Sequence, residues 1–370
     1  MNRRCFLTSS TLAMTAPLFA APSKKPPAAD LELFREVTRV PAIVVAGLVD
    51  GAPLALASGV KDARKSDPVS VDTLFPAASL TKPVFALAVR KLVRAGRLSW
   101  DAPLQEITDL GLTGEAARIT AAHVLSHATG LPNWRFQPEL KLEPGFAPGS
   151  RWQYSGEGYV LLQRVVESIT AQPIATHLQE SILAPFGMAS STLAWTPELE
   201  ATAAAGHDRN GAPLEKSLGY YAQRNHEILE KAELRAATAT YEQIEAAYAK
   251  SAAAPLPVMI APNVAGSMMT TAADYARFLT RLAADMLEHP ADYRPRVEVN
   301  RALGWTLGLG VDGSAFFQWG DGPGFKHLAW IRPRAKTGVV FLTNGDRGQA
   351  LYSRVLRRVL GEDPATLYWL

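Results

Sequence analysis

Cysteine and long apolar runs are the two features that this sequence has least of. Its one cysteine, Cys5, lies in a segment that we expect to be cleaved off, so no disulfide can form in the mature chain. After that segment, no stretch approaches the ~18 continuous apolar residues that a membrane-spanning helix needs. These two absences exclude a disulfide-stabilised scaffold and argue against a membrane span.

The sequence also lacks a marked excess of either charge. Its 370 residues carry 38 Lys and Arg against 35 Asp and Glu, a formal net charge of +3. Arg3 and Arg4 account for two of the positive charges, and the nearly neutral remainder gives no reason to expect nucleic acid or an anionic membrane as a partner. With 48% hydrophobic and 20% charged residues, the chain is globular in composition, as one large domain or a sheet-based domain with an insertion.

The first 21 residues have the pattern of an export signal. Arg3 and Arg4 are followed by a modest apolar stretch and then by two alanines. Paired arginines before Phe-Leu resemble a twin-arginine signal, which carries proteins across a membrane already folded. The alternative, an amphipathic first helix, is disfavoured by Pro17 and by the following Pro- and Lys-rich segment. We therefore expect a signal peptide at 1–21, a linker at 22–34 and a periplasmic mature protein.

Strand-like patterns occur near both ends of the mature chain, and helix-like patterns lie between them. We expect strands at 42–49, 54–60, 305–311, 315–319, 326–331 and 339–343. We expect helices after Ser79 and at 119–125, 159–170, 177–185, 270–282 and about 349–360. The economical arrangement is an α/β (α+β) fold in which one antiparallel sheet joins the N- and C-terminal strands, flanked by helices and accompanied by a mainly helical lobe.

Residues 199–256 differ from their surroundings. They are rich in Ala, Glu and Lys and show no β pattern, while Tyr241, Ile244 and Tyr248 keep helical spacing. We expect an inserted helical segment here, packed against the rest of a single domain that spans about 35–362.

Residues 73–83 carry the pattern of a nucleophile and its base. An amphipathic helix follows, and Pro83 suits a first helical turn, so Ser79 should lie at or beside the helix N-terminus, with Lys82 on the same face. A desolvated lysine can take the proton of a serine hydroxyl, and free N–H groups at a helix N-terminus can stabilise an oxyanion. In isolation, however, a helix that begins with Ser and exposes a Lys one turn later is common.

Two later stretches strengthen this interpretation. Tyr154, just before a predicted helix, has a phenol that could relay protons between nucleophile and leaving group, although a buried core tyrosine is the plainer alternative. Gln318, Trp319 and Gly320 open a glycine-rich segment that would let backbone approach a ligand closely, the plainer alternative being an ordinary hairpin. No long helix follows it, so it is not a dinucleotide loop.

Together, Ser-Leu-Thr-Lys at 79–82, Tyr-Ser-Gly at 154–156 and Gln-Trp-Gly at 318–320 resemble the three motifs of the serine β-lactamase-related family. That family contains class C β-lactamases, penicillin-binding D-peptidases and family VIII carboxylesterases. The resemblance runs from about residue 35 to about 345. It implies a β-lactamase/transpeptidase-like fold, a serine hydrolase without a cofactor, catalysis by Ser79, Lys82 and Tyr154, and an oxyanion hole formed by the backbone N–H groups of Ser79 and Asp321.

Two positions depart from the family pattern. The second motif of lactamases and peptidases ends in Asn, which binds the substrate's amide side chain, whereas this chain has Gly156. The third motif usually opens with Lys or His, which can hold a substrate carboxylate, whereas this chain has the neutral Gln318. We expect Gly156, Gln318, Trp319 and Gly320 to contact the substrate. Both departures weaken the case for β-lactam or D-Ala-D-Ala recognition and leave the acyl-transfer residues in place.

Three competing motifs are disfavoured. Lys-Thr-Gly at 336–338 spells the lactamase third motif, but it follows the glycine-rich segment instead of preceding it, so we interpret Lys336 as a solvated turn residue. His123 and His127 lack the neighbouring Glu of an HExxH zinc motif and an evident third ligand, so we expect no metal. No Gly-x-Ser-x-Gly elbow of an α/β-hydrolase occurs.

The sequence therefore predicts a secreted serine hydrolase that cleaves esters or amides through an acyl-serine, with carboxylesterase activity favoured. The alternative activities are those of a D-aminopeptidase or D,D-carboxypeptidase, or of a β-lactamase. A further alternative is a catalytically silent relative that binds ligands. The expected partner is a small-molecule or peptidoglycan-related acyl substrate, with no nucleic acid and no membrane span.

Overall fold

The computed structural model describes residues 28–135, 141–216, 218–251, 261–300 and 303–370. The predicted signal peptide 1–21 and the first part of the predicted linker lie outside these residues. The rest of that linker differs from expectation, because helix α1 (Ala28–Thr38) already begins within it. Leu31 is buried against the body of the protein, which gives this short helix a packed face. Within the part of the chain that the structure describes, no helix is both long and apolar enough to cross a membrane.

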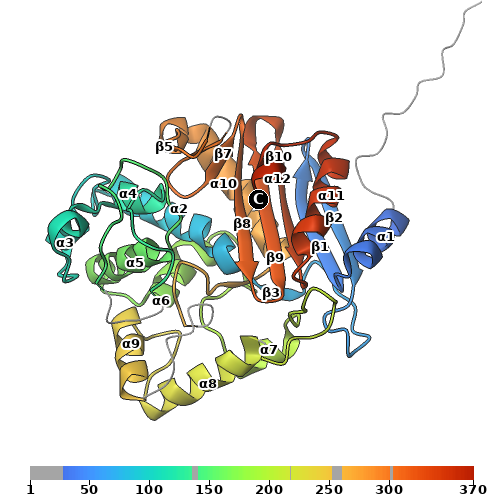
Figure 1. The fold of residues 1–370 in the computed structure, drawn as a ribbon, viewed down its shortest axis with the longest axis horizontal. Helices are drawn as coiled ribbons and strands as arrows, with labels where there is room; N and C mark the ends of the chain where they lie inside the picture. Colours follow the sequence, from blue (N-terminus) through green and yellow to red (C-terminus); the bar gives the residue numbers. More distant parts are fainter. Residues whose placement is uncertain (1–27, 136–140, 217, 252–260, 301–302) are drawn as a thin grey trace, which may run out of the picture.

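One eight-stranded sheet organises the molecule, in the order β2-β1-β10-β9-β8-β7-β6-β5 (Figure 1). Every neighbouring pair is antiparallel, and β1 pairs with β10, so the N- and C-terminal strands meet as the sequence predicts. The strands are β1 (Ala42–Val49), β2 (Ala52–Gly59), β5 (Val297–Glu298), β6 (Leu303–Trp305), β7 (Gly310–Asp312), β8 (Ala315–Gly322), β9 (Phe325–Arg332) and β10 (Thr337–Thr343).

Helices cover both faces of the sheet, because β1 is apolar on both. Val44 and Ala46 belong to the core formed with α2 (Thr81–Arg94) and α10 (Ala272–Glu288), whereas Ile43 and Val45 belong to the core formed with α1 and α11 (Gly348–Leu360). Alternate side chains of a strand point to opposite faces, so a strand buried on both sides shows a continuous apolar run. The C-terminal helix α12 (Thr366–Trp369) joins the α11 face.

A mainly helical lobe lies beside the sheet (Figure 1). Its body contains α3 (Leu104–Ile107), η2 (Gly114–Arg118), α4 (Ala121–Leu125), α5 (Gly156–Thr170), α6 (Ile174–Leu178) and a π-helical turn at Gln179–Leu183. The predicted insertion 199–256, part of which lies outside the described residues, begins within α7 (Pro197–Thr202) and contains α8 (Leu218–Lys231) and α9 (Tyr241–Lys250). Helices α8 and α9 contribute to a small core of their own.

The prediction of one strand at 305–311 is wrong. The chain turns back at 306–309, so this segment forms two short strands, β6 and β7, that pair with each other. Gly308 makes the turn possible, because its φ of 104° is left-handed and an added Cβ would lie 2.3 Å from the Ala86 Cβ on α2. Arg90 of α2 donates a hydrogen bond to the Leu307 carbonyl. Contacts with a distant helix override the local strand propensity.

Candidate active site

Ser79 lies at the point where the small sheet of β3 (Leu74–Pro76) and β4 (Met269–Thr271) leads into α2. It is the central residue of a 3₁₀ turn, η1 (Ala78–Leu80), that continues into α2 and so confirms its predicted place beside a helix N-terminus. Ala78 has a left-handed φ of 48°, which is unfavourable for a residue with a Cβ.

Three hydrogen bonds hold this turn in place. The Ala77 N–H donates to the Met268 carbonyl at 2.7 Å, the Thr81 hydroxyl to the Ala78 carbonyl at 2.6 Å, and the Tyr275 phenol to the Leu80 carbonyl at 2.9 Å. The residue just before β4 and a side chain of α10 therefore help to position Ser79, which is itself only partly buried.

Lys82 has the geometry and the environment of a base for Ser79. Its Nζ lies 3.0 Å from Ser79 Oγ and donates to the Ala265 carbonyl at 2.5 Å. The side chain is only 1% exposed, and within the described ranges no carboxylate forms an ion pair with it. Burial lowers the pKa of Lys82 to about 7, because the charged form is poorly solvated there. A substantial fraction of Lys82 is thus neutral at neutral pH.

The Ala265 carbonyl is a site component that sequence reasoning missed. The side-chain oxygen of Asn263 accepts the N–H groups of Ala265 and Gly266 at 3.0 and 3.1 Å, which fixes this loop. Gln163 on α5 holds the loop from the other side by accepting the Val264 N–H at 3.0 Å. No motif marks Ala265, because only its backbone takes part.

Tyr154 joins Ser79 and Lys82, as the sequence predicts. Lys82 Nζ lies 4.9 Å from the centre of the Tyr154 ring, and the Gln318 amide donates to the Tyr154 hydroxyl at 3.3 Å. Burial raises the pKa of Tyr154, and the Ser79 and Gln318 side chains offset this only in part. The phenol therefore remains protonated at neutral pH, so it can donate a proton as a general acid but is not available as a general base.

Aromatic rings hold the Tyr154 phenol in position. His127 stacks on it with ring centres 4.1 Å apart, and Trp319 lies 5.1 Å away. The imidazole of His127 is fully buried, and its Nδ1 accepts the Ser155 N–H at 3.1 Å, so Nε2 carries the proton of the neutral ring. Burial and the nearby Lys82 keep the pKa of His127 well below its usual value.

The edge of β8 facing Tyr154 carries backbone groups that no other strand uses. Strand β7 pairs with β8 only at 315–317, so residues 318–322 have a strand partner, β9, on one edge alone among the described residues. Gly322 and Phe325 close a two-residue turn and so form a hydrogen-bonded pair. Hydrogen-bonded and non-bonded pairs alternate along an antiparallel ladder. The N–H groups of Trp319 and Asp321 therefore point to the free edge.

Gln318, which the sequence predicts to contact the substrate, is buried beside Tyr154. Its side chain is 0% exposed, and its amide nitrogen also donates to the Trp319 carbonyl at 2.8 Å. Gly320 lies against the nucleophile turn, because an added Cβ would lie 2.7 Å from the Ala77 carbonyl oxygen. The Asp321 carboxylate, which is exposed, pairs with Lys326 on β9.

Gly156 faces an indole that sequence reasoning did not single out. A Cβ at Gly156 would lie 2.6 Å from Cζ2 and Cη2 of Trp134, so no side chain fits there while the indole keeps its place. The Gly156 N–H donates to the carbonyl and to the side-chain oxygen of Asn133, at 3.0 and 2.9 Å, which fastens the Trp134 loop to the start of α5.

Of the residues in the competing motifs, His127 packs on Tyr154, as described above, whereas Lys336 and His123 have other surroundings. Lys336 is exposed in the left-handed turn between β9 and β10, at the far end of β9 from Asp321, roughly 20 Å away at 3.3 Å per residue. His123 accepts the Thr120 N–H in a helix cap. Within the described residues, no group of three or more His, Cys, Asp or Glu could hold a metal ion.

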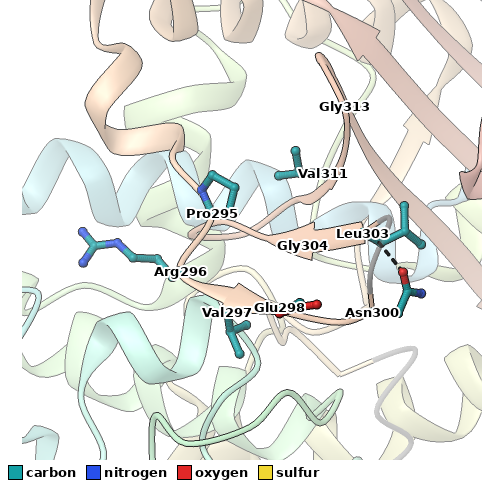
Figure 2. A pocket seen from close by; sticks show the side chains of 9 residues that line it. All are labelled: Pro295, Arg296, Val297, Glu298, Asn300, Leu303, Gly304, Val311 and Gly313. Carbon is teal, nitrogen blue, oxygen red and sulfur yellow. Dashed lines mark hydrogen bonds between the residues drawn. The ribbon is translucent and has the colours of Figure 1, made fainter.

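A surface hollow lies at the β5 edge of the sheet (Figure 2). It lies along β5, β6 and β7, where Asn300 accepts the Leu303 N–H at 2.9 Å. Its lining contains none of the predicted catalytic residues and no serine, lysine or tyrosine: it consists of Pro295, Arg296, Val297, Glu298, Asn300, Leu303, Gly304, Val311 and Gly313.

Comparison with known proteins supports the family resemblance. A family model described as Beta-lactamase matches residues 31–361. Esterase EstB of Burkholderia gladioli is 34% identical over 163 residues, which cover 36% of this chain and 41% of the esterase. Penicillin-binding protein 4* of Bacillus subtilis is 29% identical over 151 residues, which cover 35% of this chain and 33% of that protein. These two alignments thus span less than half the length of either relative.

Wider alignments exist at lower identity. Penicillin-binding protein 4 of Amycolatopsis lactamdurans is 25% identical over 385 aligned positions, covering 90% of this chain and 88% of that protein. The octameric penicillin-binding protein homologue from Pyrococcus abyssi superposes with a TM-score of 0.69 at 20% identity, covering 91% of this chain and 78% of that one. A class C β-lactamase superposes with a TM-score of 0.69 at 16% identity, covering 90% and 94%. The two solved structures show the fold.

Proposed function

The chain belongs to the β-lactamase family, a family of serine hydrolases, and we propose that it is an exported carboxylesterase acting through an acyl-serine intermediate. The observation that carries this proposal is the 3.0 Å distance between Ser79 Oγ and Lys82 Nζ. The Lys82 amine is buried, which lowers its pKa to about 7 and favours its neutral form. A serine hydroxyl needs such a base before it can attack a carbonyl carbon at neutral pH.

Acylation proceeds from this contact. Neutral Lys82 Nζ accepts the Ser79 proton as Oγ bonds to the ester carbonyl carbon, and the carbonyl oxygen takes up the negative charge. The backbone N–H groups of Ser79 and Asp321 stabilise that oxyanion. When the C–O bond to the alcohol breaks, the leaving oxygen takes the Tyr154 proton, and Lys82 returns its extra proton to Tyr154. Water then attacks the acyl-serine by the reverse relay and releases the acid.

Two features favour esters. Gln318 is neutral where a carboxylate-binding cation would otherwise stand, and the nearest cation of the β8–β9 hairpin, Lys326, is paired with Asp321. At Gly156 the place of an amide side chain is taken by the Trp134 indole. The identity to a protein named as an esterase supports the same choice.

A D-aminopeptidase, D,D-carboxypeptidase or β-lactamase activity is the second candidate. It is favoured by the alignment with a penicillin-binding protein over 90% of this chain. A catalytically silent, ligand-binding relative is the third candidate, and the presence of all three acyl-transfer side chains argues against it.

Labelling and a substrate panel test the proposal together. A fluorophosphonate should label the wild-type protein and should leave Ser79→Ala unlabelled while that variant keeps its circular dichroism spectrum. On one preparation, p-nitrophenyl esters should be turned over faster than nitrocefin or D-Ala peptides. Faster turnover of either of the latter would replace the esterase assignment, and an unlabelled wild type would support the silent alternative.

Export through the twin-arginine route and the domain limits are part of the same proposal. Arg3 and Arg4 precede an apolar stretch, and the single domain spans about 35–362 with a helical insertion at about 199–256. Replacing both arginines with lysine should leave the precursor in the cytoplasm, as judged by cell fractionation. Unchanged periplasmic accumulation of that double variant would contradict the proposed route.

A further inference from the structure

The Trp134 indole occupies the space that a side chain at position 156 would otherwise fill. The residue after Tyr154, Ser155, is extended, with φ of −139° and ψ of 119°. Residues on either side of an extended residue point their Cβ atoms to the same side of the chain. A side chain at Gly156 would therefore point to the same side as the Tyr154 phenol, and that is where the Trp134 indole lies, 2.6 Å from the would-be Cβ.

The loop that carries Trp134 is fastened on both sides of the indole. On one side, Asn133 accepts the N–H groups of Gly156 and Glu157, and the Ser155 hydroxyl donates to the Pro132 carbonyl at 2.9 Å. On the other side, the Arg135 guanidinium pairs with the Glu157 carboxylate at 3.1 Å. The indole itself is only partly buried, so one part packs against Gly156 and the core while another part is exposed.

Two of the three substituents of the ester carbonyl carbon, the oxyanion and the leaving oxygen, already have a place in the proposed mechanism. The oxyanion belongs at the free edge of β8, and the leaving oxygen belongs at the Tyr154 hydroxyl, which Gln318 of β8 holds. The acyl substituent is then the one that runs away from β8, along residues 154–156, toward the indole. An indole presents a flat apolar surface and no carbonyl acceptor, whereas a carboxamide side chain would bind a substrate amide.

We infer that Trp134 is the specificity-determining residue of this site, and that it selects esters whose acyl group is compact and apolar. This inference rests on the proposed esterase function and goes beyond it by naming the acyl class. Because an apolar wall discriminates by contact area, its removal should cost most for acyl groups that touch it and least for those too large to fit.

The test is a double-variant cycle at positions 134 and 156, measured with p-nitrophenyl esters of graded acyl size. Trp134→Ala should lower kcat/KM for a butyrate ester roughly tenfold and raise the relative rate for a phenylacetyl ester. Gly156→Ala alone should also lower the butyrate rate, because its Cβ displaces the indole. In the Trp134→Ala background, Gly156→Ala should have little further effect, since the clash is gone.

Two controls separate this inference from folding and from the function itself. Trp100→Ala removes another partly buried tryptophan that packs against the same core, beyond the opposite end of the 14-residue helix α2, and should leave the acyl profile unchanged. Fluorophosphonate labelling of Ser79 in each variant reports whether the acyl-transfer machinery is intact. Full labelling with an unaltered acyl profile in Trp134→Ala would overturn the role of Trp134 while leaving the esterase proposal standing. If the effects of Trp134→Ala and Gly156→Ala on kcat/KM for the butyrate ester were additive, the role of Trp134 would likewise be overturned.

Discussion

Two turns of this protein each present a lysine within a family-like motif, and their surroundings differ completely. Lys82 follows the strained turn at Ser79, is 1% exposed, and lies against the rings of Tyr154 and Tyr159, 4.9 and 5.3 Å from their centres. Lys336 lies in the turn between β9 and β10 and is exposed to solvent. Lys336 matches the lactamase letters Lys-Thr-Gly, yet only Lys82 combines desolvation with a nucleophile at 3.0 Å. Burial and neighbours, and not motif letters, determine which lysine can act as a base.

The largest effect should follow removal of the buried lysine. Lys82→Ala deprives Ser79 of its base and should lower the acylation rate by about 10²–10⁴-fold, as measured by the burst of p-nitrophenolate. Lys91→Ala is the matched control, because Lys91 lies on the same helix and is exposed. Near-normal acylation by Lys82→Ala would place the base elsewhere.

Tyr154→Phe should have the next largest effect, about 10²-fold on kcat, because the leaving oxygen loses its proton donor while the ring packing remains. Tyr159→Phe serves as the control. Tyr159 is also a buried phenol against Lys82, and its hydroxyl has no hydrogen-bond partner among the described residues. Equal losses in both variants would indicate a packing effect and would remove the proton-relay role from Tyr154.

Gln318→Lys should place a cation beside the Tyr154 hydroxyl, where the neutral Gln318 amide now lies. A charge-assisted hydrogen bond to a substrate carboxylate is worth about 1.5–3 kcal/mol, so kcat/KM for carboxylate-bearing esters should rise roughly tenfold relative to neutral esters. Gln318→Met is the neutral control of similar length. A preference that stays unchanged in the lysine variant would show that position 318 does not face the substrate.

Lys336→Ala should have the smallest effect, with rates and substrate preference within twofold of wild type, because the turn is solvated and at the far end of β9. Steady-state kinetics on the same ester pair as for Gln318→Lys provides the measurement. A selective loss of turnover for carboxylate-bearing esters would make Lys-Thr-Gly the working motif and would shift the strand alignment by one hairpin.

The sequence predicted the sheet well and its interruptions poorly. Strand β1 has the predicted limits, and the antiparallel union of the terminal strands follows from alternating and continuous apolar patterns. The hairpin at Gly308 was missed because its cause is a contact with Ala86, more than 200 residues earlier in the chain. Similarly, the predicted helix at 177–185 begins at Ile174 and passes into a π-helical turn, which no local pattern signals.

In the site, too, the features that follow from local sequence could be predicted, and those that depend on distant contacts could not. Ser79 and Lys82 are three residues apart, so helical spacing alone brings them together, and the structure places Tyr154 and Gln318 beside them. The Ala265 carbonyl and the Trp134 indole could not be found in this way, because the first acts through its backbone and the second through its contact with a residue that has no side chain. The glycine at 156 was the available signal for Trp134, since it marks a place where something else approaches closely.

The pH dependence of acylation tests the central claim, that Lys82 is the base, most directly. Because burial lowers the pKa of Lys82 to about 7, the neutral amine is lost as the pH falls through 7. The burst rate should therefore be constant above about pH 8 and should fall roughly tenfold per unit below about pH 6. Glu200, whose pKa burial also raises to about 7, provides the control, and Glu200→Gln should keep the same midpoint. A burst rate that does not change between pH 5.5 and 9, or a midpoint that moves in Glu200→Gln, would contradict the assignment of Lys82.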